Sequence, residues 1–231
     1  MLVFAKHEAT FLNSEREAFL GGMMAPKEKE RTPERMVAFS DAIFAFAITL
    51  LAFNIKVPDV PGGLSSVELV AWMATLLPTI LIYALSFWVI ANFWVAHHQI
   101  FERIRRLDDQ LIWMNLAYLF VISLLPFPTA VLVDYGDTSV APMLYAFSMA
   151  LAGLLLLRMW LHAVKYQHLE AGVSPVEIRH RAAHSFASAG VFIVSIPIAI
   201  FSPTLAELSW LLIFLAKPLS HRYVSQAEQA N

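Results

Sequence analysis

A carboxylate and an arginine lie at the start of one long apolar segment, Arg35–Lys56, which reads RMVAFSDAIFAFAITLLAFNIK. A charged side chain in a segment of membrane-spanning length is costly, so Asp41 indicates a functional or structural role. Arg35 and Asp41 are six residues apart, which separates them in a helix by about 120° and by roughly 9 Å along the axis. Because they do not form the usual i,i+4 pair, Asp41 is expected to contact another helix or water. The alternative is that Arg35 and Asp41 are an ordinary pair whose charged ends extend to the membrane interface. The hydroxyl of Ser40 could form a hydrogen bond with the local backbone.

Bulky apolar side chains recur along one face of the same segment. At about 100° per helical residue, Phe39, Phe46, Leu50 and Phe53 fall close together. If this stripe meets its own copies in a ring, it could form a constriction that excludes water and gates a pore. Ordinary packing against lipid or a neighbouring helix is the alternative. Thr49 lies next to Leu50, where its hydroxyl could face either the pathway or a backbone carbonyl.

A second group of polar side chains follows in the next two apolar segments. Trp94 is expected to lie at the membrane interface, where tryptophan is common. His97 and His98 are adjacent, so in a helix they point about 100° apart, and no third ligand is spaced to complete a metal site. We therefore expect no metal here. One histidine should contact Asp41 or a backbone carbonyl while the other faces water, and Asn115 is a further candidate partner.

The composition indicates a membrane protein. Hydrophobic residues make up 58% of the 231 residues, charged residues 15%, and the mean hydropathy is +0.62. Soluble domains carry about a quarter charged residues. Cysteine is absent, which excludes disulfides and thiolate metal sites. No nucleophile motif, phosphate-binding loop or pair of carboxylates at membrane depth is present, so no enzyme is expected, and Arg103–Arg106 is too small a basic patch for nucleic acid.

Six apolar segments predict six transmembrane helices, because a chain within lipid must satisfy its own backbone hydrogen bonds. Pro78 predicts a kink in the second segment, and Pro126 and Pro128 lie near the end of the third. The segments are approximately 35–57, 67–95, 111–133, 140–164, 185–201 and 204–219. We expect residues 1–34 to form a cytoplasmic arm, residues 35–220 the transmembrane domain, and residues 221–231 a cytoplasmic tail.

The basic residues predict the orientation. Of the 16 lysines and arginines, all except Lys56 lie on one side: at or before Arg35, in or beside the alternate loops, or at the C-terminal end of the last segment and beyond it. By the positive-inside rule that side is cytoplasmic, so both termini are expected inside the cell. The protein should be a multi-pass protein of the cell membrane.

Three motifs resemble a known family. They are Arg35–Asp41, read as R-x-x-x-F-S-D, Trp94–Phe101, read as W-x-x-H-H-x-x-F after the second helix, and Leu124–Thr129, read as LLPFPT on the third. In this order they are similar to the prokaryotic branch of the potassium channels named for the endosomal and lysosomal channel transmembrane protein 175. The resemblance covers essentially all of residues 35–219. It implies one six-helix repeat per chain, assembly as a homotetramer, and no carbonyl-lined filter loop.

The resemblance also implies roles for residues of the first helix, which lines the pore in this family. The apolar residues five, nine and twelve positions after the motif aspartate form the constriction, which here are Phe46, Leu50 and Phe53. Thr49 matches a hydroxyl position implicated in selectivity. The family usually has isoleucine or leucine where this chain has Phe46, and four phenyl rings at that position could either close the path more tightly or rotate aside. The motif residues that would support assembly and gating are Arg35, Phe39, Ser40 and Asp41, with Trp94, His97, His98 and Asn115 as polar partners.

We therefore expect a homotetrameric, potassium-preferring cation channel. Its partners would be its own copies, membrane lipid and permeant K⁺, with no cofactor and no nucleic acid. One alternative is a proton-coupled secondary transporter in which Asp41 and His97 relay protons, although repeats and broken helices typical of transporters are not evident in the sequence. The other alternative is a non-conducting membrane scaffold.

Overall fold

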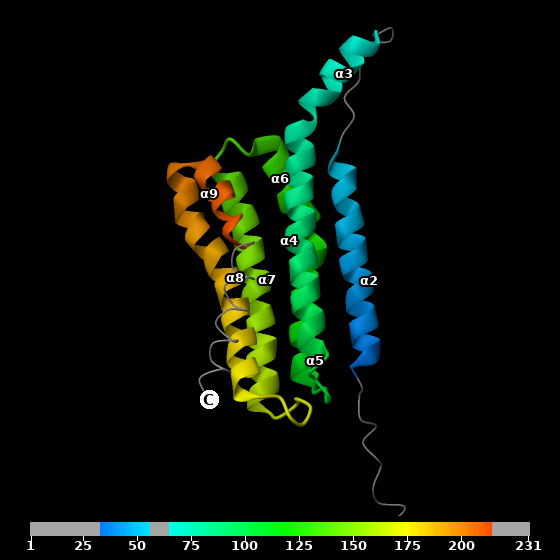
Figure 1. Ribbon diagram of the computed structural model, residues 1–231, viewed down its shortest axis with the longest axis vertical. Coiled ribbons are helices and arrows are strands. Elements are labelled where there is room, and N and C mark those ends of the chain that lie inside the picture. Colours follow the sequence, from blue (N-terminus) through cyan, green and yellow to red (C-terminus); the bar gives the residue numbers. More distant parts are fainter. Residues whose placement is uncertain (1–32, 56–64, 214–231) are drawn as a thin grey trace, which may run out of the picture. The chain divides into compact units, whose positions relative to one another are not determined.

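The computed structural model describes residues 33–55 and 65–213, all of which belong to one compact unit, Pro33–Asn231 (Figure 1). The expected cytoplasmic arm, apart from its last two residues, and the expected C-terminal tail lie outside the described residues, as does Lys56. The described part is helical, and the pairing it contains outside helices is one isolated antiparallel bridge between Ile104 and Leu169.

The first described helix, α2, spans Glu34–Leu51 and continues into a short 3-10 helix, η1, at Ala52–Asn54. Its alanines and leucines favour a helix, and Pro33 precedes it with a backbone geometry that suits a helix start. α2 packs against α4 and α5 of its own chain. In Figure 1 it runs alongside α4.

The second predicted segment is two helices, α3 at Ser66–Thr75 and α4 at Leu77–Phe101. The break at Leu76 accounts for the expected kink, because Pro78 cannot donate a hydrogen bond to the preceding turn. The predicted end near Val95 was wrong. α4 continues to Phe101, so the motif Trp94–Phe101 lies inside the helix rather than after it, because these last turns bury their apolar side chains in the core.

The third predicted segment is also divided. α5 spans Asp109–Leu124 and α6 spans Pro126–Tyr135, with Leu125 between them. Asp108 caps α5, since its Oδ1 accepts a hydrogen bond of 2.7 Å from the backbone amide of Leu111. The break follows from the prolines, because neither Pro126 nor Pro128 supplies an amide hydrogen for a continuous helix.

The last helices are α7 at Val140–Lys165, α8 at Pro175–Phe201 and α9 at Pro203–Ser209. α7 agrees with its predicted range. α8 begins ten residues before the expected Ser185, because Ser174 caps its first turn and Glu177 binds two arginines. α9 covers the start of the sixth segment, whose residues beyond 213 lie outside the described part.

Close packing of small residues joins α7 to α8, which lie side by side in Figure 1. A Cβ atom placed on Gly153 of α7 would lie 2.9 Å from the Cβ of Ala189 on α8, so only glycine allows this approach. Within the described residues, four continuous segments are long and apolar enough to cross a membrane: Leu77–Phe101, Asp109–Tyr135, Val140–Lys165 and Pro175–Phe201. The chain is a mostly helical membrane protein.

Candidate functional site

α2 has two distinct faces. The side chains of Ser40, Phe44, Ala47 and Leu51, spaced four, three and four residues apart, are at most 1% exposed and face α4 and α5. This spacing is that of one helical face, so the sequence folds α2 with this stripe toward its own subunit. The orientation of α2 about its axis is thereby fixed.

Three aromatic side chains, two on α2 and one on η1, point away from the rest of the subunit. Phe39 is 50% exposed, Phe46 60% and Phe53 81%, whereas Leu50 is half-buried at the edge of the stripe. Thr49 is exposed as well, and its hydroxyl donates a 2.9 Å hydrogen bond to the backbone carbonyl of Phe46. A large apolar surface of this kind must be covered by lipid or by another chain.

A buried polar network fastens α2 to its neighbours. The amide of Asn115 on α5 donates to the hydroxyl of Ser40 at 3.1 Å, and Ser40 donates to the carbonyl of Met36 at 2.8 Å. The Oδ1 of Asn115 lies 2.8 Å from Nε2 of His97 on α4. Ser40, Asn115 and His97 are all 0% exposed, so three helices share one chain of hydrogen bonds in an apolar surrounding.

The ring of His97 is held between aromatic side chains. It stacks on Tyr118 at 5.4 Å with an interplanar angle of 1°, and its centroid lies 4.4 Å from that of Phe101 and 5.8 Å from that of Phe44. The expectation that one of the two histidines contacts Asp41 or a backbone carbonyl is therefore wrong, because His97 bonds the Asn115 side chain and His98 lies beside Glu102.

Asp41 has a partner on another helix. Its Oδ1 accepts a 2.8 Å hydrogen bond from Nε1 of Trp94 on α4, and the Trp94 ring stacks on His98 at 5.6 Å. His98 Nε2 in turn lies 3.3 Å from Oε1 of Glu102. Arg35 is exposed in the first turn of α2. The structure thus places Asp41 with Trp94 rather than with the arginine of its own motif.

Two further buried contacts at these helices were not expected from the sequence. The hydroxyl of Tyr118 donates to the carbonyl of Phe93 at 3.3 Å. Thr129, the last residue of the LLPFPT motif, donates its hydroxyl to the carbonyl of Leu125 at 2.9 Å, a carbonyl that also accepts the Thr129 amide at 3.2 Å. The same hydroxyl lies 3.4 Å from that of Ser86. The threonine three residues after Pro126 was the signal available for the second contact.

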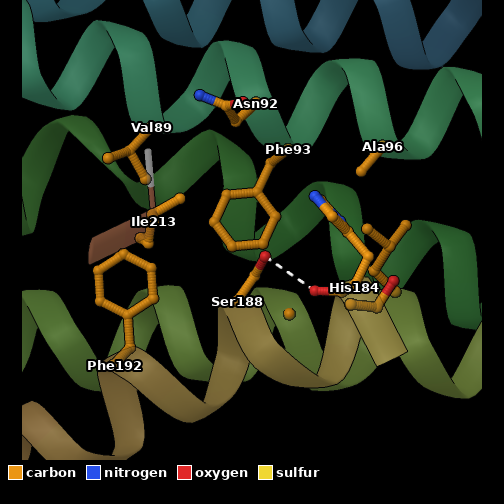
Figure 2. Close-up of a pocket in the computed structure, with 11 residues that line it drawn as sticks. Val89, Asn92, Phe93, Ala96, His184, Ser188, Phe192 and Ile213 are labelled. Carbon is orange, nitrogen blue, oxygen red and sulfur yellow. Dashed lines mark hydrogen bonds between the residues drawn. The ribbon is translucent and has the colours of Figure 1, made fainter. Parts of the chain in front are cut away.

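A small cavity lies between α4, α7 and α8 (Figure 2). Its volume is about 20 Å³, and Asn92, Phe93, His184 and Phe192 are among the residues that line it. In Figure 2 the Ser188 hydroxyl donates to the carbonyl of His184 at the edge of this space. The volume suits about one water molecule, so this cavity is too small for a hydrated ion.

The comparison with known proteins decides the family. The sequence model described as the endosomal/lysosomal potassium channel TMEM175 matches residues 35–126. A potassium channel of Chamaesiphon minutus is 37% identical over 150 residues, which cover 64% of this chain and 72% of that channel. The chain belongs to the TMEM175 family. This TMEM175 protein is also 40% identical over 141 residues to a potassium channel of Streptomyces collinus, covering 58% of this chain and 66% of that one.

The fold of this TMEM175 protein agrees with a solved member of the family. The crystal structure of a lysosomal potassium-selective channel TMEM175 homolog from Chamaesiphon minutus aligns with a TM-score of 0.69 and 30% identity. The alignment covers 81% of this chain and 97% of that one. The architecture of the chain is therefore that of a TMEM175 channel subunit.

Proposed function

We propose that this TMEM175 protein is a potassium-preferring cation channel in which four copies of α2 surround the ion path. The observation that carries the proposal is the face of α2 and η1 on which Phe39, Phe46 and Phe53 are at least half exposed, while the opposite face of α2 packs inside the subunit. Its similarity to two bacterial potassium channels supports the choice of ion.

Oligomerisation follows from the number of helices available. A single α2 per chain cannot enclose a pore, whereas a ring of copies around a symmetry axis can, and closed cyclic symmetry is the common solution. The polar network of Ser40, Asn115 and His97 would keep the aromatic face of α2 directed toward that axis. Arg35 and Asp41 would position the same helix, with Asp41 acting through its hydrogen bond to Trp94.

The proposed mechanism is passive. An ion would enter from the cytoplasmic side, lose part of its water at a constriction formed by Phe46, Leu50 and Phe53, and pass the hydroxyl of Thr49. Selectivity for potassium over sodium should be modest, because K⁺ loses water at lower cost and few fixed dipoles replace that water. Both termini would be cytoplasmic, in a six-helix protein of the cell membrane.

A proton-coupled transporter that relays protons between Asp41 and His97 fits the contacts less well. Asp41 bonds Trp94, and His97 bonds Asn115, so these two side chains belong to separate hydrogen bonds. The cavity beside α4 suits about one water molecule. A non-conducting scaffold would show no flux in any assay.

The test is single-channel recording of purified protein in planar bilayers, with K⁺ and Na⁺ on opposite sides. Phe46→Ala removes the ring proposed to narrow the path, so conductance should rise and the K⁺/Na⁺ permeability ratio should fall. Thr49→Ala should change the ratio with a smaller effect on conductance. Phe186→Ala is the matched control, because Phe186 is 62% exposed but lies on α8, which packs against α7 and α9.

Unchanged conductance and permeability ratio in both α2 variants would count against the assignment of the pore. Currents that reverse at the proton equilibrium potential and ignore the K⁺ gradient would favour proton permeation instead. The mass of the particle in detergent is a separate check, since a single subunit would contradict a pore made from copies of α2.

A further inference from the structure

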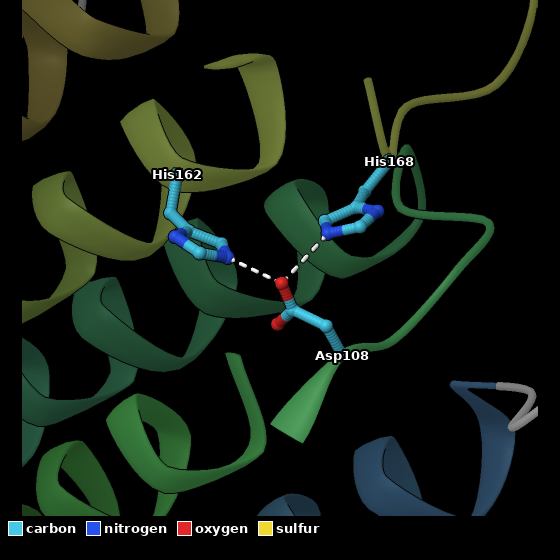
Figure 3. Close-up of side chains that lie close together, drawn as sticks. All are labelled: Asp108, His162 and His168. Carbon is cyan, nitrogen blue, oxygen red and sulfur yellow. Dashed lines mark hydrogen bonds and ion pairs between the residues drawn. The ribbon is translucent and has the colours of Figure 1, made fainter. Parts of the chain in front are cut away.

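Three side chains meet at the end of the subunit that the basic residues mark as cytoplasmic (Figure 3). Asp108 precedes α5, His162 lies in the last turn of α7, and His168 lies in the loop between α7 and α8. The Oδ2 of Asp108 is 2.7 Å from Nε2 of His162 and 3.0 Å from Nε2 of His168. Both imidazoles thus direct the same ring nitrogen at one carboxylate oxygen.

The backbones that carry these residues are fixed before any ligand binds. The carbonyl of His168 accepts hydrogen bonds from the amides of Arg105 and Arg106, and its own amide donates to the carbonyl of Ala163 at 2.9 Å. The bridge between Ile104 and Leu169 joins the same two loops. The cluster therefore rests on a preformed frame, and little conformational entropy would be lost on binding.

The remaining atoms around the cluster also suit a ligand set. The other oxygen of Asp108, Oδ1, accepts a hydrogen bond from the backbone amide of Leu111. This hydrogen bond holds the carboxylate in place and leaves Oδ2 for the histidines. The ring of Tyr166 packs on both imidazoles, with centroids 4.5 Å from His162 and 6.3 Å from His168. Support of this kind around first ligands raises the affinity of metal sites.

From this geometry we propose that Asp108, His162 and His168 bind a divalent metal ion of the zinc type. The three ligand atoms all lie within 4.8 Å of one another. Tetrahedral coordination at about 2.0–2.1 Å separates ligand atoms by roughly 3.3 Å, so small side-chain shifts open the two nitrogen–oxygen distances to the required value. Two imidazoles and one carboxylate select zinc, cobalt or nickel over magnesium and calcium, which prefer oxygen ligands.

The site is accessible to an ion from solvent. The side chain of Asp108 is 35% exposed, and those of His162 and His168 are 7% and 15% exposed. An open groove lined by Lys165 and Tyr166 also reaches His162. Water would complete the coordination from this side. A bound ion would crosslink the loop before α5 to the loop before α8, and so stiffen the base of the helices that hold α2.

The test uses protein prepared without a polyhistidine tag and stripped with a chelator. Co²⁺ is added alone, and its visible absorption reports coordination by nitrogen and oxygen ligands. We expect about one Co²⁺ per chain in the wild type, displaced by Zn²⁺. Asp108→Asn, which retains the Oδ1 cap, and His168→Gln should each weaken binding by roughly tenfold or more.

His180→Gln is the matched control, because His180 lies on α8 and its buried Nε2 makes no hydrogen bond within the described residues. Zn²⁺ should raise the midpoint of thermal unfolding in the wild type and in this control, and leave it unchanged in the two ligand variants. No saturable Co²⁺ signal in the wild type, or equal binding in all four proteins, would overturn the proposal.

A measurement on the wild type alone covers the case in which a ligand variant fails to fold. X-ray absorption of the zinc-loaded protein should show two imidazoles and oxygen in the first coordination shell. A shell of oxygen alone would reject the site. These outcomes do not depend on whether the protein conducts ions, so the two proposals can fail independently.

Discussion

Replacement of Asn115 by alanine tests the buried network that fastens α2 to α4 and α5. The substitution removes the 2.8 Å contact to His97 and the 3.1 Å hydrogen bond to Ser40. Ser40 keeps its hydrogen bond to the carbonyl of Met36. The imidazole of His97 loses the only hydrogen bond that it makes within the described residues, because its other nitrogen, Nδ1, has no partner there. The main cost is therefore a buried imidazole left without a partner.

The magnitude follows from this accounting. An unsatisfied buried polar group costs about 1–3 kcal/mol, and the space left by the amide adds about 1 kcal/mol. Hydrogen bonds between membrane helices average only about 0.6 kcal/mol, because the polar groups of the unfolded chain in the membrane also find partners. The cost of about 1–3 kcal/mol for an unsatisfied buried group applies here, because the side chains of Asn115 and His97 are both 0% exposed. We expect a loss of about 3 kcal/mol, or roughly 6–12 °C in the unfolding midpoint.

The assay is thermal unfolding in detergent followed by tryptophan fluorescence. Asn92→Ala is the control, because Asn92 makes the same type of side-chain bond only to its own helix, at the carbonyl of Trp88. Asn92→Ala should shift the midpoint far less. The double variant His97→Phe/Asn115→Ala should be more stable than Asn115→Ala alone, because the orphaned nitrogen is gone. Equal shifts for Asn115→Ala and Asn92→Ala, or no recovery in the double variant, would refute this reasoning.

Two more predictions concern the packing of α7 on α8 and the charge of Asp108. Gly153→Ala should destabilise the protein by about 1–3 kcal/mol, because the added Cβ would lie 2.9 Å from the Cβ of Ala189. A Cβ added at Gly190 would have no neighbouring atom within 4 Å, so Gly190→Ala should stabilise α8 by up to about 1 kcal/mol. Thermal unfolding of the two variants compares these effects, and equal shifts would contradict the close contact at Gly153. Although partial burial raises the pKa of Asp108, hydrogen bonds from its two histidine partners lower it from 3.8 to about 2. With chelator present, the wild type should have a larger free energy of unfolding than Asp108→Asn above about pH 4, and this difference should disappear as the pH falls through about 2. A difference that stays constant over this pH range would contradict the prediction.

The sequence was sufficient where local chemistry dominates. The apolar run of α7 predicted its bounds almost to the residue, because length and hydropathy are properties of one segment. The break near Pro78 was predicted from the missing amide hydrogen of proline, whereas the break of the third segment at Leu125 was not predicted, although it has the same cause. The stripe of Phe39, Phe46 and Phe53 followed from helical periodicity, and the three motifs identified the family.

The tertiary structure decided which side chains meet. A helix fixes the relative directions of its side chains but not its own rotation against its neighbours, so the partner of Asp41 could not be read from spacing. The same holds for the hydrogen bond between His97 and Asn115, which replaces the expected one.

Contacts between distant loops were also invisible in the sequence. α8 extends ten residues further than its hydropathy suggested, because Arg103 from another loop binds Glu177 in its first turn. Asp108 lies 54 and 60 residues from His162 and His168, and only the packing of α5 on α7 with the paired loops brings them together. Sequence periodicity is a local property, whereas a shared hydrogen bond or metal ligand set depends on how whole helices are placed.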